Sequence, residues 1–312
     1  MPALRASADA PAAPLPRWRV LLPYVGLVAT MLCWAGNWVV GRAIRDEMPP
    51  IALNFWRWAI ALLILAPFAL PRLRGKGAVL RRRAPILLSL GATGVALFQV
   101  LVYLGLRSTT TVNAVLMNSA APIFIILCAW ILERDRASLR QILGMLISLC
   151  GIVTIMERGD ISALAHFRFD VGALVILAAM PVWGVYSVLL KRRPRELDGL
   201  GLLFAIGVSG LLLLAPAYAA ETLWFRAPVA SLASAGAVLY VALFASLLAY
   251  FCWNYGVAAV GPNRAGFMIH LLPAFGTLLG MAINGESVYR YHFLGIGTIL
   301  LGVLLATSSR GR

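Results

Sequence analysis

The chain is divided into about ten apolar segments, each close to the length that a helix needs to cross a lipid bilayer. Crossing ~30 Å of hydrocarbon takes about 20 residues at a rise of about 1.5 Å each. We expect spans at residues 21–42, 50–70, 84–106, 111–132, 140–157, 171–190, 199–220, 234–257, 263–284 and 292–309. Only short connections remain between them. The sequence therefore predicts an all-α integral membrane protein with ten transmembrane helices and no sizeable soluble domain.

The composition agrees with a chain whose main solvent is lipid. Hydrophobic residues make up 61% and charged residues 12% of the 312 residues, and the mean hydropathy is +0.87, which is unusual for a soluble domain. The net charge of +15 raises the question of nucleic acid, but nucleic-acid binding needs a basic face on a folded surface. Here the basic residues lie between apolar segments. We interpret them as determinants of orientation and as contacts to anionic membrane lipid, and we expect no nucleic-acid partner.

Lys and Arg are distributed unevenly between the two sides of the predicted membrane. Nineteen of them fall in the two tails and in the connections on the same side, seven fall in the alternate connections, and Arg57 lies inside a span. Because the cytoplasmic side carries the excess of positive charge, this pattern predicts an inner-membrane protein with both termini in the cytoplasm. Residues 1–20 precede the first span and are expected to form a disordered cytoplasmic tail.

The two halves of the chain are related by an internal duplication. Shifts of 149 and then 151 residues superimpose Trp34 on Trp183, Pro67 on Pro216, Gly105 on Gly256, Pro122 on Pro273, Gly144 on Gly295 and Gly151 on Gly302. Each repeat, at 21–158 and 171–309, has five crossings, so the second must enter the membrane in the inverted orientation. Inverted repeats of this kind enclose a central cavity and support alternating access.

Polar and aromatic side chains recur on single faces of several spans. Trp34, Asn37 and Trp38 follow the i, i+3, i+4 spacing of one helix face. Such groups face either a cavity or a neighbouring helix, where they form interhelical hydrogen bonds. The candidate substrate-binding residues are Trp34, Asn37, Trp38, Arg57, Gln99, Tyr103, Asn118, Trp183, Tyr186, Tyr250, Trp253, Asn254 and His270.

The two ionisable candidates each have a second interpretation. Arg57 can anchor a substrate carboxylate, or its side chain can extend to the nearer interface from a depth of ~10 Å; Ile206 stands at its position in the second repeat. His270 can carry a coupling proton, or it can be a packing residue with satisfied hydrogen bonds. All twelve acidic residues lie in tails, connections or span ends. Their placement favours a neutral, zwitterionic or anionic substrate and facilitated diffusion over tight proton coupling.

Several local signals concern helix geometry. Pro122 and Pro273 predict bends at equivalent positions, which act as hinges or shape a static cavity. The glycines of the fifth and tenth spans predict a close packing seam, within a monomer or in a homodimer. Ser138 and Gln141 have the spacing of a capping box. The four cysteines and three histidines lack metal-ligand spacing, so we expect neither a metal nor a cofactor.

Four segments together carry a family resemblance: MLCWAGNWVVGRAI, NFWRWAIALLILAPF, LERDRASLRQILGMLISLCGIVTI and NGESVYRYHFLGIGTILLGVLLA. With the duplicated five-helix units, they make residues 21–309 resemble the EamA-type branch of the drug/metabolite transporter superfamily. The resemblance implies a secondary carrier, often an exporter of amino acids or other metabolites, with its cavity between the two repeats. Within that branch, the aromatic amino acid exporters are the nearest likeness.

Together these observations favour a secondary transporter that moves a small organic metabolite, an aromatic or neutral amino acid, by alternating access as an exporter or uniporter. Export of a nucleobase, a sugar derivative or a drug is the alternative. A membrane-embedded enzyme is disfavoured because the sequence contains no HExxH, no GxSxG and no paired intramembrane aspartates. An ion channel or an assembly factor is disfavoured by the inverted repeat with its aromatic-rich spans.

The charge distribution yields a prediction about topology. A membrane-impermeant label directed at either end of the chain should react only after the membrane is permeabilised, because both ends are expected in the cytoplasm. Ends that react from opposite faces would contradict the even number of crossings.

Overall fold

The computed structural model describes residues 17–109, 111–157, 159, 170–284 and 289–308, and all regular structure in these ranges is helical. Within them, nine helices are long and apolar enough to cross a membrane. A tenth crossing, Pro262–Asn284, is divided by a short 3-10 segment and ends beside residues 285–288, outside the described part. The expected all-α fold with ten crossings is confirmed. Most of the expected tail, together with Arg158 and Arg168, lies outside the described residues.

The helices follow the expected spans closely. The first half contains α1 (Arg17–Ala43), α2 (Pro50–Leu73), α3 (Gly77–Arg82), α4 (Ala84–Leu90), η1 (Gly91–Leu97), α5 (Phe98–Leu106), α6 (Thr111–Asn118), α7 (Ala121–Glu133) and α8 (Leu139–Met156). The second half contains α9 (Val171–Leu189), η3 (Leu190–Arg192), α10 (Gly199–Trp224), α11 (Leu232–Tyr240), η4 (Val241–Leu248), α12 (Ala249–Val260), α13 (Pro262–Phe267), η5 (Met268–His270), α14 (Leu271–Asn284) and α15 (Arg290–Thr307). Since α1 begins at Arg17, the last four residues of the expected tail are helical.

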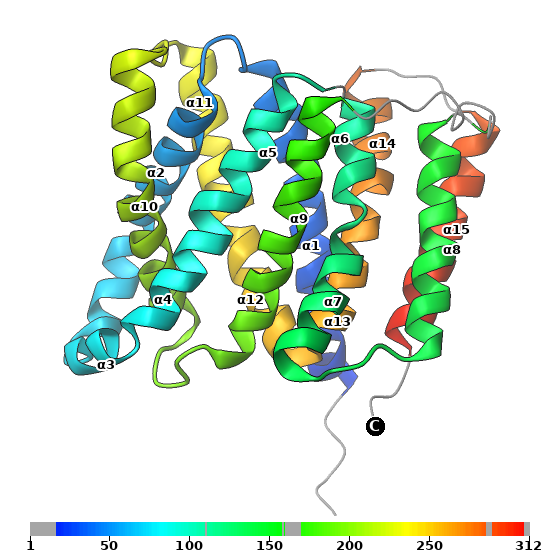
Figure 1. Cartoon of the computed structure of the whole chain (residues 1–312), viewed down its shortest axis with the longest axis horizontal. Coiled ribbons are helices and arrows are strands. Elements are labelled where there is room, and N and C mark those ends of the chain that lie inside the picture. The colour runs from blue at the N-terminus through cyan, green and yellow to red at the C-terminus, as the bar shows by residue number, and fades with distance from the viewer. Residues whose placement is uncertain (1–16, 110, 158, 160–169, 285–288, 309–312) are drawn as a thin grey trace, which may run out of the picture.

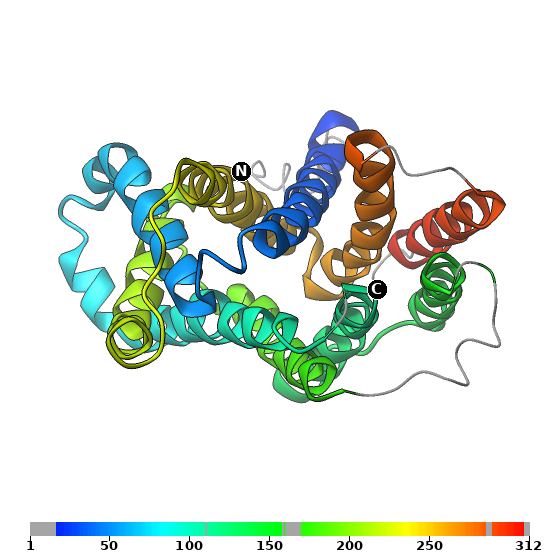
Figure 2. The same cartoon turned by 90° about the horizontal axis from the view of Figure 1, so that it is seen from above.

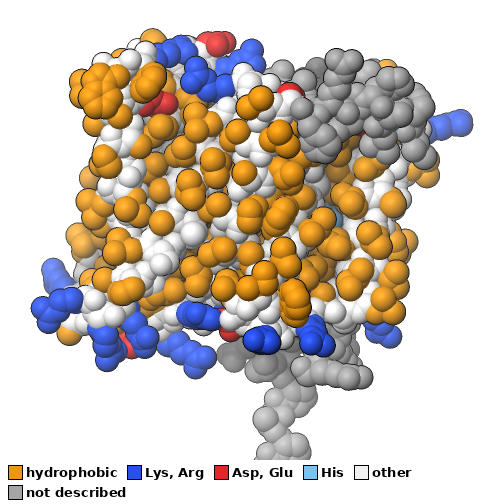
Figure 3. Space-filling model, viewed as in Figure 1, with side chains coloured by type: hydrophobic (Ala, Val, Ile, Leu, Met, Phe, Trp, Pro, Cys, Tyr) orange, Lys and Arg blue, Asp and Glu red, His pale blue; other side chains and the backbone are white. Residues whose placement is uncertain are grey.

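The spans run alternately up and down across the molecule (Figure 1). The start of α1 and the end of α15 lie on one side, which we call the termini side; the connection between α1 and α2 lies on the opposite, far side. Hydrophobic side chains cover the middle of the molecule, and Lys and Arg gather toward its two edges (Figure 3). This banding is what a chain with a lipid-facing girdle requires.

The third and eighth spans each contain a π-helical turn at the same place in the repeat. Residues 91–97 form the turn in the first half, and residues 241–248 form it in the second. Shifted by 151 residues, the first turn falls on 242–248. π-Turns are rare, and they occur frequently at functional sites. Their presence in both repeats therefore makes these two spans candidates for a functional role.

The fourth and ninth spans are interrupted at matching positions. Between α6 and α7 the helix breaks at Ser119 and Ala120, and between α13 and α14 it tightens into the 3-10 segment that ends at His270. Pro122 and Pro273 follow these interruptions. Because proline lacks an N–H, the carbonyl four residues before it loses its helical donor. The expected distortions are therefore present as broken helices.

The glycine seam lies within the chain. Helices α8 and α15 pack side by side at one end of the molecule (Figure 2). A Cβ placed on Gly144 would come within 2.5 Å of the Gly302 carbonyl oxygen, and one on Gly151 within 2.6 Å of that of Gly295. These reciprocal contacts between equivalent glycines are what an inverted repeat would produce.

Carboxylates and caps fix several helix ends. Ser138 and Gln141 form the predicted capping box at the start of α8, with hydrogen bonds of 2.8 and 3.3 Å. Glu221, buried at the far end of α10, accepts hydrogen bonds from the backbone N–H groups of Ile51 and Ala52 at 3.3 and 2.7 Å. Acceptors at a helix N-terminus satisfy donors that have no partner within the helix.

The seam predicts a sharp difference between two glycines of α15. Gly302→Ala should destabilise the protein by about 1–3 kcal/mol, because the added methyl meets the backbone of α8, which cannot move aside alone. Gly297→Ala is the matched control, since a Cβ there meets nothing within 4 Å. Thermal unfolding in detergent measures both variants; equal melting temperatures would contradict the seam.

Candidate functional site

A small cavity lies among helices of both repeats. Its lining consists of Trp34, Asn37, Trp38, Arg57, Phe98, Gln99, Asn118, Trp183, Tyr250, Ile269 and Leu272. The centre of a water-sized sphere can move within about 30 Å³ of this cavity. One water needs ~10–15 Å³ by this measure, so the space holds about two waters and is too small for an amino acid.

Arg57 is the charged group of this cavity, and it is 1% exposed. Its Nε donates to Ser246 Oγ at 2.8 Å, Nη1 donates to Tyr103 Oη at 3.1 Å, and Nη2 donates to the Ala245 carbonyl at 3.1 Å. The side chain therefore does not extend to the membrane interface. Among the described residues, no carboxylate lies within ion-pair distance of it.

The π-turns supply backbone acceptors to the same region. Trp34 Nε1 donates to the Ala245 carbonyl at 3.2 Å, which Arg57 also contacts. In the first repeat, Asn54 Nδ2 donates to the Val95 carbonyl at 2.8 Å, and Tyr250 Oη donates to the Gly94 carbonyl. Wide turns weaken the internal helical hydrogen bonds, so side chains of other helices can bond to these carbonyls and hold the turns in place.

Aromatic rings of both repeats form one cluster against the cavity. The equivalent residues Trp34 and Trp183 meet edge to face, with ring centroids 5.2 Å apart. Trp253 lies 5.4 Å from each of them, and Tyr250 lies 6.0 Å from Trp34. Edge-to-face and tilted contacts of this kind stabilise beyond the burial of area alone. The cluster joins the two halves at the centre of the molecule.

Two Tyr–Asn hydrogen bonds flank the cluster. Tyr103 Oη donates to Asn37 Oδ1 at 3.2 Å, and Tyr186 Oη donates to Asn254 Oδ1 at 2.7 Å. All four side chains are buried. The first pair joins α1 to α5, and the second joins α9 to α12.

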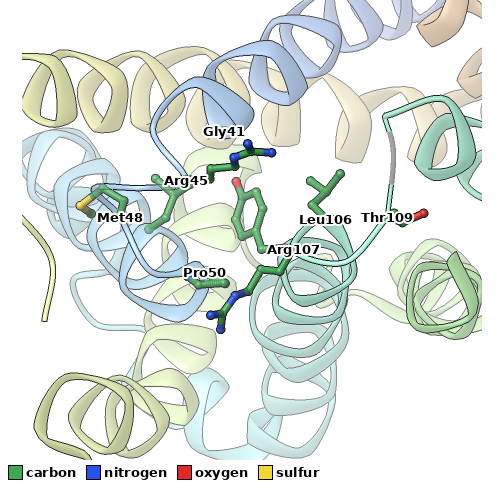
Figure 4. A pocket seen from close by; sticks show the side chains of 9 residues that line it. Gly41, Arg45, Met48, Pro50, Leu106, Arg107 and Thr109 are labelled. Carbon is green, nitrogen blue, oxygen red and sulfur yellow. The ribbon is translucent and has the colours of Figure 1, made fainter. Parts of the chain in front are cut away.

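A second pocket opens on the far side (Figure 4). It is lined by Gly41, Arg45, Met48, Pro50, Leu53, Tyr103, Leu106, Arg107 and Thr109. It shares Arg45, Pro50 and Arg107 with a neighbouring cavity of about 540 Å³. The far side is therefore hollow as deep as Tyr103, whose hydroxyl is bonded to Asn37 and Arg57 of the central cavity.

The structure brings most candidate residues together. Eight of them line the central cavity: Trp34, Asn37, Trp38, Arg57, Gln99, Asn118, Trp183 and Tyr250. Tyr103 contacts that lining through its hydrogen bond to Asn37, and the rings of Tyr186 and Trp253 lie 4.9 and 5.4 Å from that of Trp183. Asn254 lies behind Tyr186, to which it is hydrogen-bonded.

His270 is the exception, because it is absent from the cavity lining and both of its hydrogen bonds go to residues outside that lining. Its Nε2 donates to the Ser119 carbonyl at 3.0 Å, and its Nδ1 is hydrogen-bonded to Ser148 Oγ. Ser119 lies in the break of the fourth span, so His270 joins the two interrupted helices to each other and to α8. Both ring nitrogens are satisfied, as the packing interpretation expects.

Several cavity residues escaped the analysis of the sequence. Phe98, Ile269 and Leu272 are apolar residues in apolar spans, and nothing in their type or spacing distinguishes them. Asn54 is outside the cavity lining, but its sequence position carried a usable signal. An amide in the middle of an apolar span needs a hydrogen-bond partner. Asn54 finds that partner in the π-turn of η1.

Comparison with known proteins places the chain among membrane carriers. The model of the EamA-like transporter family matches residues 21–157 and 170–308. Relatives include the uncharacterized transporter YetK of Bacillus subtilis, 26% identical over 90% of this chain and 86% of that protein. The probable terminal-alkyne amino-acid exporter of Streptantibioticus cattleyicolor is 29% identical over 89% of this chain and 91% of its own length.

Two further matches agree with this placement. The uncharacterized inner membrane transporter YedA of Escherichia coli is 27% identical over 93% of this chain and 92% of its own length. A solved crystal structure that is 21% identical superposes with a TM-score of 0.73 over 92% of this chain and 96% of that one. At that identity, the superposition shows the fold alone. The matches across both halves, together with the ten-crossing helical fold, show that this chain is a multi-span membrane protein of the EamA-like transporter family.

Proposed function

We propose that this transporter carries an aromatic or neutral amino acid, or a similar compact metabolite with a carboxylate, through the central cavity. Arg57 would bind the carboxylate, and the aromatic cluster would contact the rest of the substrate. Transport would proceed by alternating access across the inner membrane as export or uniport, with both termini in the cytoplasm.

The observation that carries this proposal is the missing counter-charge of Arg57. A charged side chain at the centre of a bilayer costs at least ~2.5–3.5 kcal/mol, even where the surroundings adapt. The three oxygens that Arg57 contacts are all neutral. They accept from three of its five N–H donors and do not neutralise its charge, so a bound carboxylate would supply what the described residues lack.

The remaining lining fits an amino acid better than a strongly polar substrate. Trp34, Trp38 and Trp183 present aromatic surface, and Gln99 and Asn118 add amide groups. Amides can bind an amino group or a carboxylate, whereas the rings favour an apolar side chain. The similarity to a probable amino-acid exporter supports the same substrate class.

The size of the cavity supports a carrier cycle with a conformational change. Ligand sites usually span ~300–1,000 Å³, and the space here is far smaller. The cavity must therefore widen before it binds a substrate. The broken fourth and ninth spans, whose Asn118 and Ile269 line the cavity, are suitable places for that change.

The anchor role is tested by Arg57→Gln in proteoliposomes. The half-saturation concentration for phenylalanine should rise about 10- to 100-fold, because a hydrogen bond to a charged group contributes ~1.5–3 kcal/mol. Phenethylamine, which lacks the carboxylate, should be affected far less. Arg57→Lys keeps the charge and should retain part of the preference for the carboxylate.

The matched control is Arg81→Gln, the same substitution at an exposed position on α3. It should leave both substrates unaffected. If Arg57→Gln weakened phenylalanine and phenethylamine equally, Arg57 would have a structural role only, and the carboxylate anchor would be wrong. Thermal unfolding of each variant shows whether the protein is intact when transport is measured.

A further inference from the structure

The two buried Tyr–Asn pairs occupy equivalent positions in the repeats, with the residue types exchanged. A shift of 149 residues places Asn37 on Tyr186, and a shift of 151 places Tyr103 on Asn254. In both pairs the phenol donates to the amide oxygen. The tyrosine and the asparagine have changed places between the two helices. The hydrogen bond is therefore kept, but the opposite helix of the pair supplies the donor. The interaction therefore exists twice in the structure.

The pairs lie on opposite sides of the central cavity. Helices α1 and α5 end on the far side, and Asn37 and Tyr103 lie six and three residues before those ends. Helices α9 and α12 end on the termini side, and Tyr186 and Asn254 lie three and six residues before those ends. At a rise of ~1.5 Å per residue, each residue is within about 9 Å of the end of its helix.

We propose that these pairs are the two gates of the carrier. Asn37–Tyr103 closes the far side, and Tyr186–Asn254 closes the termini side. Arg57 is hydrogen-bonded to the far gate and so tethers that gate but not the other. Each gate is one buried hydrogen bond between two helices of the same repeat. Both gates are closed in this structure, which agrees with the small volume between them.

The far pocket supports the assignment of the far gate. Tyr103 lines that pocket, whereas its partners Asn37 and Arg57 line the central cavity. The hydrogen bonds of the Tyr103 hydroxyl therefore lie between the two spaces. Breaking them would remove the contact that separates the central cavity from the hollow far side.

The tether makes the two gates unequal. Arg57 Nη1 donates to Tyr103 Oη, while Nε and Nη2 hold Ser246 and the Ala245 carbonyl in the π-turn of the other repeat. At the equivalent position, Ile206 offers no donor to Tyr186. This asymmetry has a consequence that rests on the proposed function: a substrate carboxylate that bonds to Arg57 competes with Tyr103 and loosens the far gate only.

The test uses a matched pair of substitutions, Tyr103→Phe and Tyr186→Phe. The four native cysteines are replaced by alanine, and Leu272→Cys supplies one thiol in the cavity lining, outside both pairs. A membrane-impermeant maleimide is added to intact spheroplasts or to inside-out vesicles, without any substrate. Tyr103→Phe removes both hydrogen bonds of the hydroxyl, the one to Asn37 and the one from Arg57, and should raise labelling at least about fivefold from the far side alone. Tyr186→Phe should raise it from the termini side alone.

The tether is tested in the same assay. Arg57→Gln should raise far-side labelling as Tyr103→Phe does, and the double variant should not exceed the stronger single one, because both remove the same contact. Ile206→Ala, the equivalent truncation in the second repeat, should leave the labelling from both sides unchanged. Asn37→Ser and Asn254→Ser serve as the second pair if a Tyr→Phe variant is poorly folded.

The outcomes separate this proposal from the proposed function. If both Tyr→Phe variants increased labelling from the same side, or neither changed it, the gates would be wrong, whatever the substrate preference of Arg57. If Arg57→Gln changed labelling from both sides equally, the tether would be wrong. Loss of carboxylate preference is measured separately by transport, so a failure there would leave the sidedness of the gates unaffected.

Discussion

The buried guanidinium of Arg57, which has no carboxylate partner among the described residues, constrains much of this structure. Arg57 lies inside an apolar span, and its environment compensates it with three neutral oxygens rather than a carboxylate. Two of those oxygens come from the π-turn of the opposite repeat, so the residue that requires compensation also joins the two halves. An isolated charge in hydrocarbon is costly enough that such an arrangement is seldom kept without a function. We propose that the function of this charge is to bind an anionic group.

The repeat explains how a small closed cavity can belong to a carrier. π-Turns, broken helices, close glycines and Tyr–Asn pairs all occur at equivalent positions in both halves. At the π-turns and broken helices, a helix can change its internal geometry. At the Tyr–Asn pairs and close glycines, a few contacts hold two neighbouring helices together. In an inverted repeat, equivalent features can lie on opposite sides of the cavity, as the two Tyr–Asn pairs do, or meet each other between the repeats, as the seam glycines do. A duplication of this kind supports the alternating access that we propose for this carrier.

Much of the fold followed from the sequence because lipid imposes simple rules. Apolar length gave the spans, and the spacing of Trp34, Asn37 and Trp38 placed them on one face that does reach the cavity. The glycines of the fifth and tenth spans predicted a close packing seam, and the structure places it between α8 and α15 of one chain. These signals are local or periodic, so one sequence is enough to read them.

The details of the site could not be predicted in the same way. A π-turn adds a residue to a helical turn and rotates the faces that follow it, which hides residues such as Phe98 from a regular helical pattern. The partners of His270 and Asn54 are backbone carbonyls, whose availability depends on a break or a wide turn elsewhere in the chain. Sequence shows that these side chains need partners but does not show which carbonyls are free.

Counterflow in proteoliposomes tests the central claim most directly. Vesicles containing the purified protein are loaded with an excess of one unlabelled compound, and the uptake of its labelled form is followed for amino acids, nucleobases and sugars. The account predicts strong transient accumulation for apolar or aromatic amino acids, weaker accumulation for the amines that lack the carboxylate, and none for sugars. Accumulation of uncharged compounds together with an absence of accumulation for every amino acid would contradict it.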